Sequence, residues 1–214
     1  MTATQIELDY QRTAAFDVDA QKTFTPLLPN ELPVPGGERI AQALNAQAAK
    51  ACIRVGSKDV HGPDPAWLTR DPGQIGQPTG IASAPEYWVA HAQLGTEGVE
   101  LLDGLPHPQQ GYNFFIYKGI EPDQHPYGAV YHDIAESQST GVIEYLREQQ
   151  ITDVLVGGLA LDFCVQATAR QLQQAGFQVW IHASATAPIT PDGGKQARQA
   201  LEALGVGWLP SEVD

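Results

Sequence analysis

Apolar positions along the chain follow two spacings that alternate from one end to the other. Short continuous apolar runs bounded by glycine or polar residues are typical of buried strands, and apolar residues three or four apart indicate helices. The predicted strands span 13–19, 51–57, 113–117, 153–157, a segment ending near 181, and 206–209. The predicted helices follow the glycines at 36–37 as far as 50 and then span 140–149, 162–175 and 191–204.

This alternation predicts an α/β fold of three layers, with a mostly parallel six-stranded sheet between helices on both faces. No Ser- or Pro-rich linker divides the sequence, so residues 1–214 are expected to form one domain. The segment 71–110 lacks clean periodicity and is predicted to be a long excursion over the sheet edge. Ligands of such folds bind where the parallel strands end, so residues at those ends are candidates for a site.

Four chemically capable residues follow or end the predicted strands: Asp19, Asp59, Lys118 and Cys164. If Asp162 caps the helix predicted over 162–175, Cys164 falls in the first turn of that helix, where free N–H groups and the helix dipole favour thiolate. A carboxylate such as Asp19 can accept a thiol proton, and an ammonium such as Lys118 lowers a thiol pKa. The alternative is that Cys164 is a buried small hydrophobe and Asp19 a turn residue.

Charge and cysteine usage narrow the possible partners. The formal net charge of −13 argues against nucleic acid or an anionic membrane, because both require a basic surface. Neither a leader sequence nor an apolar run long enough to cross a bilayer is found, so a cytoplasmic protein is expected. The two cysteines lack C-x-x-C spacing, which disfavours a redox pair, and Cys52 is assigned to the core of its strand. No glycine-rich nucleotide-binding pattern follows a strand.

Three motifs resemble those of the isochorismatase-like cysteine hydrolases, and within that family those of the nicotinamidases. DAQKTF (19–24) is similar to D-x-Q-x-x-F, Lys118 in FFIYKG resembles the lysine motif, and GLALDFCV (158–165) resembles G-[IL]-A-x-D-x-C-V. The resemblance runs nearly end to end, with matching order and spacing. It implies the isochorismatase-like hydrolase fold, with Cys164 as nucleophile, Asp19 as proton acceptor and Lys118 as the stabilising cation.

The same resemblance implies further features around the nucleophile. A cis peptide bond would join Leu159 to Ala160, and the N–H groups of Ala160 and Cys164 would form an oxyanion hole. Phe24, Trp88 and Leu159 would contact the substrate, with the two aromatic side chains flanking a planar ring. The alternative for both aromatic residues is an ordinary place in the core.

Asp59-Val60-His61 resembles the D-x-H metal motif of the nicotinamidases, and His91 in WVAH resembles their third ligand. Two imidazoles and a carboxylate suit a divalent metal, Zn²⁺ first and then Fe²⁺ or Mn²⁺. The alternative is a surface loop whose side chains bind nothing. Trp67 stands where some nicotinamidases have a fourth ligand, so water or another residue would complete the coordination. The remaining histidines show no metal-like spacing and are assigned to the surface or core: His107, His125, His132 and His182.

The resemblance implies an amidohydrolase that converts nicotinamide to nicotinate and ammonia through a thioester on Cys164. One alternative is a metal-independent relative acting on carbamoyl or ureido groups, which would lack the metal ligands. Another is a non-catalytic metal- or ligand-binding protein on the same fold. Isochorismate hydrolysis is disfavoured, because family members with that activity generally lack the cysteine. Apolar residues on the outer helices permit a homo-oligomer.

Overall fold

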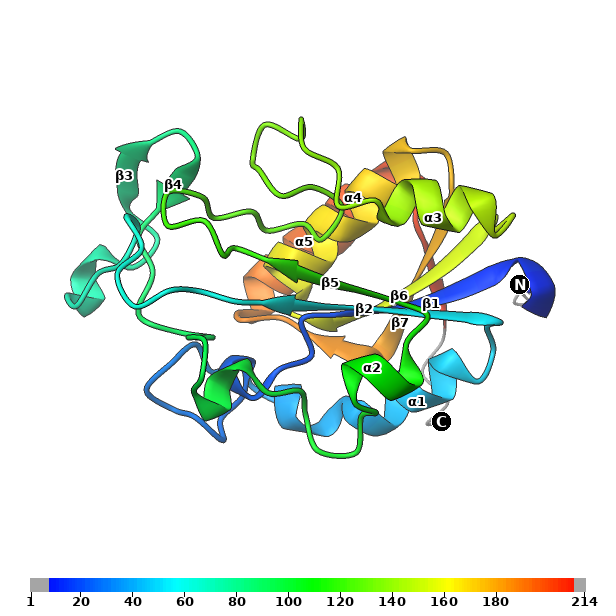
Figure 1. Cartoon of the computed structure of the whole chain (residues 1–214), viewed down its shortest axis with the longest axis horizontal. Coiled ribbons are helices and arrows are strands. Elements are labelled where there is room, and N and C mark those ends of the chain that lie inside the picture. Colours follow the sequence, from blue (N-terminus) through cyan, green and yellow to red (C-terminus); the bar gives the residue numbers. More distant parts are fainter. Residues whose placement is uncertain (1–7, 210–214) are drawn as a thin grey trace.

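A computed structural model of the chain describes residues 8–209; residues 1–7, part of the segment searched for a leader, lie outside the described residues. Its centre is a six-stranded sheet in the order β5-β2-β1-β6-β7-β8 (Figure 1). Every pairing in this sheet is parallel, which confirms the predicted α/β fold. The strands are β1 (Thr13–Val18), β2 (Ile53–Asp59), β5 (Phe114–Lys118), β6 (Asp153–Leu159), β7 (Gln178–Ala187) and β8 (Gly207–Leu209).

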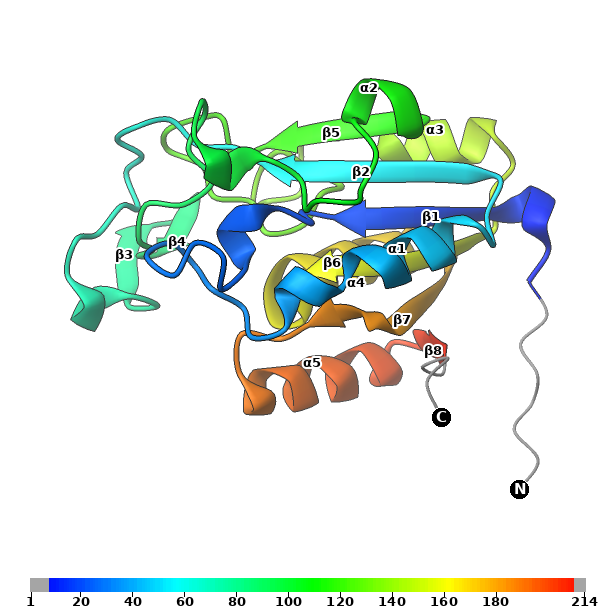
Figure 2. The same cartoon turned by 90° about the horizontal axis from the view of Figure 1, so that it is seen from below.

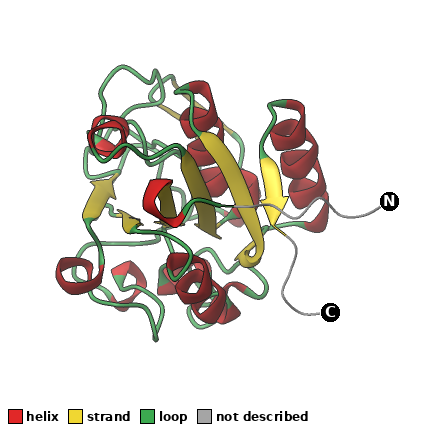
Figure 3. Ribbon diagram, turned by 90° about the vertical axis from the view of Figure 1, so that its right-hand side faces the viewer, coloured by secondary structure: helices red, strands yellow, loops and turns green. Residues whose placement is uncertain are grey.

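Helices cover both faces of this sheet, as Figures 2 and 3 show. One face carries α1 (Ala41–Ala48) and the short α2 (Pro108–Gly111), and the other carries α3 (Val142–Glu148), α4 (Gln166–Gln174) and α5 (Pro191–Ala203). Short 3-10 segments lie at Tyr10–Arg12, Lys22–Phe24, Gly37–Arg39, Pro72–Gln74 and Glu97–Val99. No helix within residues 8–209 is long and apolar enough to cross a membrane.

Two apolar cores lie on the two faces of the sheet. The larger one joins side chains of β1 and β6 to Leu146 of α3, Leu172 of α4 and Leu201 of α5. The smaller one packs Leu44 of α1 against the ends of β6 and β7. Because both faces are covered, all six residues of β1 are buried. Burial on both sides explains why the central strands read as continuous apolar runs instead of alternating patterns.

Some predicted boundaries differ from the structure. β2 continues to Asp59, so this residue belongs to the strand and not to the loop after it. Cys52 lies just before β2 and is only half-buried, which corrects its assignment to the core. Its thiol donates weak hydrogen bonds to the carbonyl oxygens of Gln11 and Thr13, at 3.4 and 3.5 Å. β7 runs on to Ala187 because its polar second half still pairs with the end of β6.

The segment 71–110 is a long excursion, as predicted, but it contains an antiparallel hairpin of β3 (Pro78–Ile81) and β4 (Ala84–Glu86). Strands of four and three residues are too short to produce a recognisable period in the sequence. Figure 1 shows the hairpin beyond the carboxyl ends of β2 and β5. The excursion therefore lies over the edge of the sheet at which the candidate residues gather.

Gly158 provides a test of how tightly β6 packs on β1. Its φ is +119°, and a Cβ there would lie 1.8 Å from the carbonyl oxygen of Val18. We expect Gly158→Ala to lower the free energy of unfolding by about 3 kcal/mol or more, because a rigid backbone atom blocks the methyl group. Urea denaturation monitored by circular dichroism measures this loss.

Gly176→Ala is the matched control for Gly158→Ala. Gly176 also has a left-handed φ, +94°, but nothing lies within 4 Å of a Cβ at this position. Only the conformational strain remains, and we expect a loss of about 1 kcal/mol. Equal losses in the two variants would show that contact with β1 does not constrain position 158.

Candidate active site

Four neighbouring parallel strands end at the same edge of the sheet (Figure 1), and the predicted catalytic residues lie at or just after these ends. Asp59 and Lys118 end β2 and β5 and are register partners, and Asp19 directly follows β1. Cys164 lies in the helical turn that follows β6. Because β5, β2, β1 and β6 are neighbours in the sheet, their carboxyl ends present these side chains to one another.

Lys118 is fully buried and contacts all the other members of this group. Its Nζ lies 3.1 Å from Asp19 Oδ2 and 2.9 Å from Asp59 Oδ1. It also donates to the Pro126 carbonyl oxygen at 3.0 Å and lies 3.8 Å from Cys164 Sγ. Burial opposes the ammonium charge, but the two carboxylates outweigh burial and raise the pKa of Lys118 well above its usual value. The side chain therefore stays cationic.

Asp19 is placed to exchange a proton. Its Oδ1 accepts a hydrogen bond of 2.6 Å from Ser57 Oγ, which in turn accepts from the Asp19 N–H at 3.1 Å. Burial raises the pKa of Asp19 above the ordinary aspartate value although the Lys118 ammonium opposes that rise. This carboxylate therefore binds a proton more readily than an exposed aspartate does, as a general base and acid requires.

Cys164 is buried, and burial acts against the expected influence of the helix terminus. Burial is the largest influence on the thiol and raises its pKa well above the ordinary value, while the Lys118 ammonium opposes this rise. A neighbouring proton acceptor is therefore needed to form the nucleophilic thiolate.

The backbone around Cys164 also differs in part from the prediction. Leu161–Val165 forms a π-helical turn ahead of α4, and Ala160 occupies the capping position, which corrects the assignment of Asp162. The Asp162 carboxylate instead accepts from the N–H groups of Ile189 and Thr190, at 2.9 and 3.2 Å. It thereby ties the turn to the start of α5. The Leu159–Ala160 peptide bond is cis, as the resemblance implied.

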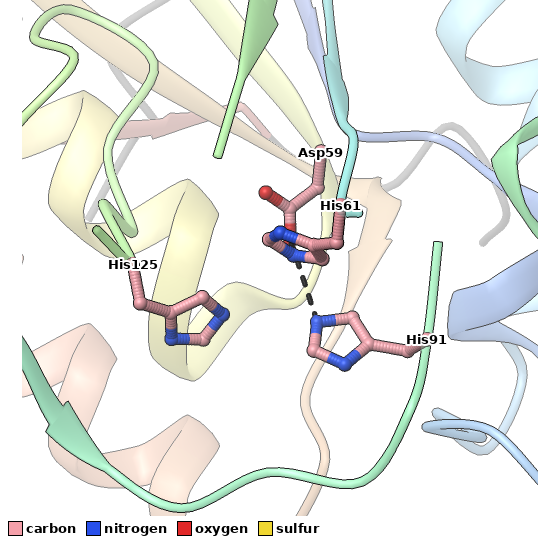
Figure 4. A group of neighbouring side chains, drawn as sticks. All are labelled: Asp59, His61, His91 and His125. Atoms are coloured by element: carbon pink, nitrogen blue, oxygen red, sulfur yellow. Dashed lines mark hydrogen bonds and ion pairs between the residues drawn. The ribbon is translucent and has the colours of Figure 1, made fainter. Parts of the chain in front are cut away.

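A second group of side chains meets beside Lys118 and contains all three predicted metal ligands (Figure 4). Asp59, His61, His91 and His125 are buried, and each offers one ligand atom within 4.8 Å of the others. Asp59 Oδ2 lies 2.8 Å from His61 Nε2 and 3.5 Å from His91 Nε2. His61 and Lys118 overcome the effect of burial and hold the pKa of Asp59 well below its usual value.

The cluster suits a divalent metal ion. His61 Nδ1 lies 2.9 Å from the Gly119 carbonyl oxygen and His91 Nδ1 lies 2.7 Å from that of Val89. In a metal-bound form each Nδ1 can donate to its carbonyl oxygen while Nε2, on the side of Asp59, would bind the ion, which is the arrangement that metal-binding imidazoles adopt. Burial also lowers the pKa of His91, so this ring is neutral. Imidazole nitrogens with one carboxylate form a typical zinc site.

His125 was predicted to be a surface or core histidine, and the structure corrects this by placing it in the cluster. It comes from the irregular segment between β5 and α3, where no spacing links it to the D-x-H motif. Trp67 does occupy the place beside the predicted ligands: its ring lies 4.6 Å from the His61 ring and 4.4 Å from that of His125. The other described histidines do not belong to this cluster.

A cavity with mostly apolar walls opens above both groups. Its aromatic lining includes two predicted substrate contacts, Phe24 and Trp88, together with Tyr127 and Phe163. Cys164, Asp59, His91 and His125 provide polar groups along the same cavity. Leu159 is not part of this lining, because its side chain is fully buried beside Leu44 of α1. The structure thus brings together the predicted site residues except the Leu159 side chain.

Sequence reasoning missed Tyr127 as well as His125. Trp88 Nε1 donates to Tyr127 Oη at 3.1 Å, and this hydroxyl donates to Glu86 Oε2 at 2.5 Å. Trp88 and Phe163 rings meet edge to face at 5.2 Å. A tyrosine two residues after a histidine in an irregular segment gives no signal of this role, since only the folded loop carries it to the cavity.

Comparison with known proteins places the chain in a family. Residues 13–212 match the family model described as Isochorismatase domain. A nicotinamidase of Acinetobacter baylyi is 30% identical over 200 residues, which cover 91% of this chain and 90% of that protein.

Two solved structures share the fold. Pyrazinamidase of Pyrococcus horikoshii in complex with zinc is 25% identical with a TM-score of 0.74, covering 92% of this chain and 98% of that chain. PnC1 from L. infantum in complex with nicotinate is 25% identical with a TM-score of 0.79, covering 95% of both chains. The chain therefore belongs to the isochorismatase family, within its nicotinamidase group of amidohydrolases.

Proposed function

We propose that the chain hydrolyses nicotinamide to nicotinate and ammonia through a thioester on Cys164. The observation that carries this proposal is the contact of one buried ammonium, that of Lys118, with Asp19, Asp59 and the Cys164 thiol. Two members of this group, Asp59 and Cys164, line a cavity with aromatic walls. The nicotinamidase activity of the Acinetobacter baylyi relative and the nicotinate in the L. infantum structure support a small pyridine carboxamide as substrate.

The cavity walls suit such a substrate. Phe24 and Trp88 line it, and a planar ring between them gains from burial and from offset stacking. A divalent metal held by Asp59, His61 and His91 would take the pyridine nitrogen as a ligand, and the nitrogen-rich donor set together with the zinc of the Pyrococcus horikoshii protein favours Zn²⁺ over Fe²⁺ or Mn²⁺. The carboxamide then faces Cys164.

Formation of the thioester begins with the resting thiol. The Asp19 carboxylate accepts the proton of Cys164 while the sulfur attacks the carboxamide carbon. The N–H groups of Ala160 and Cys164 stabilise the oxyanion. Asp19 then gives its proton to the departing nitrogen, the C–N bond breaks, and ammonia leaves. Lys118 stays charged throughout and offsets the negative charge that moves between the carboxylate and the sulfur.

Hydrolysis of the thioester repeats these roles with water. Asp19 takes a proton from a water molecule, whose oxygen attacks the thioester carbon, and the C–S bond breaks to release nicotinate. The sulfur recovers a proton from Asp19, and the site returns to its starting state. A raised Asp19 pKa makes this carboxylate a better proton acceptor than an exposed aspartate, and the protonated group can return the proton in the next step.

The alternatives fit these contacts less well. A metal-independent amidase acting on carbamoyl or ureido groups has no use for the buried cluster of one carboxylate and imidazoles beside the thiol. A non-catalytic binding protein has no use for a buried ammonium that contacts both a carboxylate and a thiol. The proposed amidase reaction uses both groups.

Ammonia release from nicotinamide by the purified protein tests the proposal directly. We expect release that is lost on treatment with a chelator and restored by Zn²⁺, because the metal orients the ring. A zinc-loaded, folded protein that releases no ammonia from nicotinamide would exclude this function, and release from carbamoyl substrates without metal would favour the metal-independent alternative.

Replacing the nucleophile should abolish activity. We expect Cys164→Ala to reduce kcat by on the order of 10³-fold or more, because no other group in the cavity can form the acyl intermediate. Cys52→Ala is the matched control, since Cys52 lies before β2 and away from the cavity lining, and it should keep the wild-type rate. Mass spectrometry of rapidly quenched enzyme should detect the acyl adduct in the wild type only. Full activity of Cys164→Ala would refute the thioester mechanism.

Ser57→Ala tests the role of Asp19 through the pH profile. The Ser57 hydroxyl stabilises the ionised form of Asp19 by donating a hydrogen bond of 2.6 Å. Removing the donor disfavours that form, so the pKa of Asp19 rises and activity is lost at a higher pH on the acidic side. We expect the acidic limb of kcat/KM to move up by about one pH unit. Ser139→Ala, on a surface loop, is the control, and an unmoved limb in Ser57→Ala would remove Asp19 as the titrating base.

A further inference from the structure

We propose that His125 is the fourth protein ligand of the metal, and that the metal thereby ties the preformed loop 121–127, which carries part of the cavity wall, to His61 and His91. This inference rests on the metal site of the proposed function. The segment that carries Asp59 and His61 offers no further ligand, since Trp67 stands beside them there. The fourth ligand would instead come from an irregular loop. The metal would then be held from three separate parts of the chain: β2 and its loop, the segment after β4, and the loop after β5.

The His125 ring has the position and the environment of a ligand. Figure 4 shows one of its nitrogens directed toward His61 and His91. The residue is 4% exposed, and its ligand atom lies within 4.8 Å of those of the other three residues. Its Nδ1 is buried without a hydrogen-bond partner among the described residues. The ring nitrogen that faces the cluster is the other one, Nε2, which is thus placed to bind a metal ion together with His61 and His91.

The His125 ring packs among three aromatic side chains and the two imidazoles of the cluster. Its ring centroid lies 4.4 Å from that of Trp67, 5.2 Å from that of Tyr127 and 6.3 Å from that of Trp88. The rings of His61 and His91 lie 5.3 and 5.7 Å away. An imidazole among apolar rings stays neutral, which is the form that binds a metal ion. This packing holds the ring in place without using its nitrogens.

Backbone contacts fix the loop independently of the side chain. The His125 N–H donates to the Ser83 carbonyl oxygen at 2.9 Å, which ties the loop to the β3–β4 hairpin. Trp67 Nε1 donates to the Gln124 carbonyl oxygen at 3.2 Å, and the Ala66 N–H donates to that of Pro122 at 2.7 Å. Trp67 is fully buried, and its ring packs between His61 and the loop and supports the loop. The ligand position is therefore prepared before any metal binds.

The next two residues connect this position to the proposed chemistry. The Pro126 carbonyl oxygen accepts from Lys118 Nζ at 3.0 Å, and Tyr127 lines the cavity and bonds Trp88. A bond between the metal and His125 would restrain both contacts. Three imidazoles and one carboxylate form a nitrogen-rich donor set that suits Zn²⁺ better than Mn²⁺ or Mg²⁺, and a zinc ion there could still accept the pyridine nitrogen as a fifth ligand.

Zinc affinity of the whole chain tests the assignment without any substrate. Competition with a chromophoric chelator measures the Zn²⁺ dissociation constant of wild type, His125→Leu and the control His132→Leu, which lies outside the cluster. We expect His125→Leu to weaken Zn²⁺ binding on the order of 100-fold or more, since loss of even an outer partner costs 10- to 100-fold. His132→Leu should match the wild type.

Thermal unfolding separates a ligand from a packing residue. If His125 binds the metal, His125→Leu should lose most of the zinc-induced rise in Tm while its metal-free Tm stays at or above that of the wild type. If His125 only packs, the metal-free Tm falls and the zinc-induced rise is unchanged, which would overturn the proposal. If His125→Leu does not fold, the wild-type protein loaded with Co²⁺ provides the test. Its proton NMR spectrum should show paramagnetically shifted resonances from three imidazoles. Shifted resonances from only two imidazoles would refute the assignment.

The result is distinguishable from failure of the proposed function. Tight zinc binding by the wild type with the same affinity in His125→Leu would refute only the role of His125. Absence of zinc binding by the wild type would refute both that role and the metal-dependent mechanism. Neither result depends on turnover of nicotinamide.

Discussion

The buried ammonium of Lys118 is the interaction on which the rest of the site depends. Removing a charge from water is costly, and it is tolerated only when opposite charges and hydrogen bonds surround it. Asp19, Asp59 and the Pro126 carbonyl oxygen provide that surrounding within 3.1 Å. Neighbouring strand ends place the two carboxylates close together, and the ammonium between them offsets their mutual repulsion. Nucleophile and metal cluster thus share one cation, and neither half of the site is electrostatically complete alone.

This shared cation also gives the two aspartates different chemistry. Asp59 uses Oδ1 for Lys118 and Oδ2 for His61, and these contacts hold its pKa well below the usual value. Asp19 has the same cation but is dominated by burial, so its pKa is raised. Environments that drive two carboxyl groups apart in pKa separate a permanent anion from a proton carrier. Asp59 is therefore suited to bind a cation and Asp19 to move a proton.

The sequence predicts the parts of this arrangement that the sheet positions. The parallel strands can be recognised from their apolar runs, and they end at or just before Asp19, Asp59 and Lys118. The strand order brings these residues together with Cys164. The effect of burial on the pKa of the Cys164 thiol could not be predicted from the sequence, because burial depends on the whole fold. Asp162 failed as a cap for a related reason: a π-helical turn redirects its carboxylate to the backbone of Ile189 and Thr190.

The residues that could not be predicted come from segments without periodicity. His125 and Tyr127 reach the cavity because the loop after β5 is bonded to Trp67 and to the β3–β4 hairpin, neither of which leaves a trace in sequence spacing. The sheet therefore sets the charges of the reaction, whereas the irregular loops set the shape of the cavity above them. The register of a sheet fixes a strand-end side chain against its neighbours, but a loop must be held by its own contacts. The packing of Trp67 against the loop is such a contact. A metal ligand from this loop would connect the loop to the strand ends that carry the charged residues.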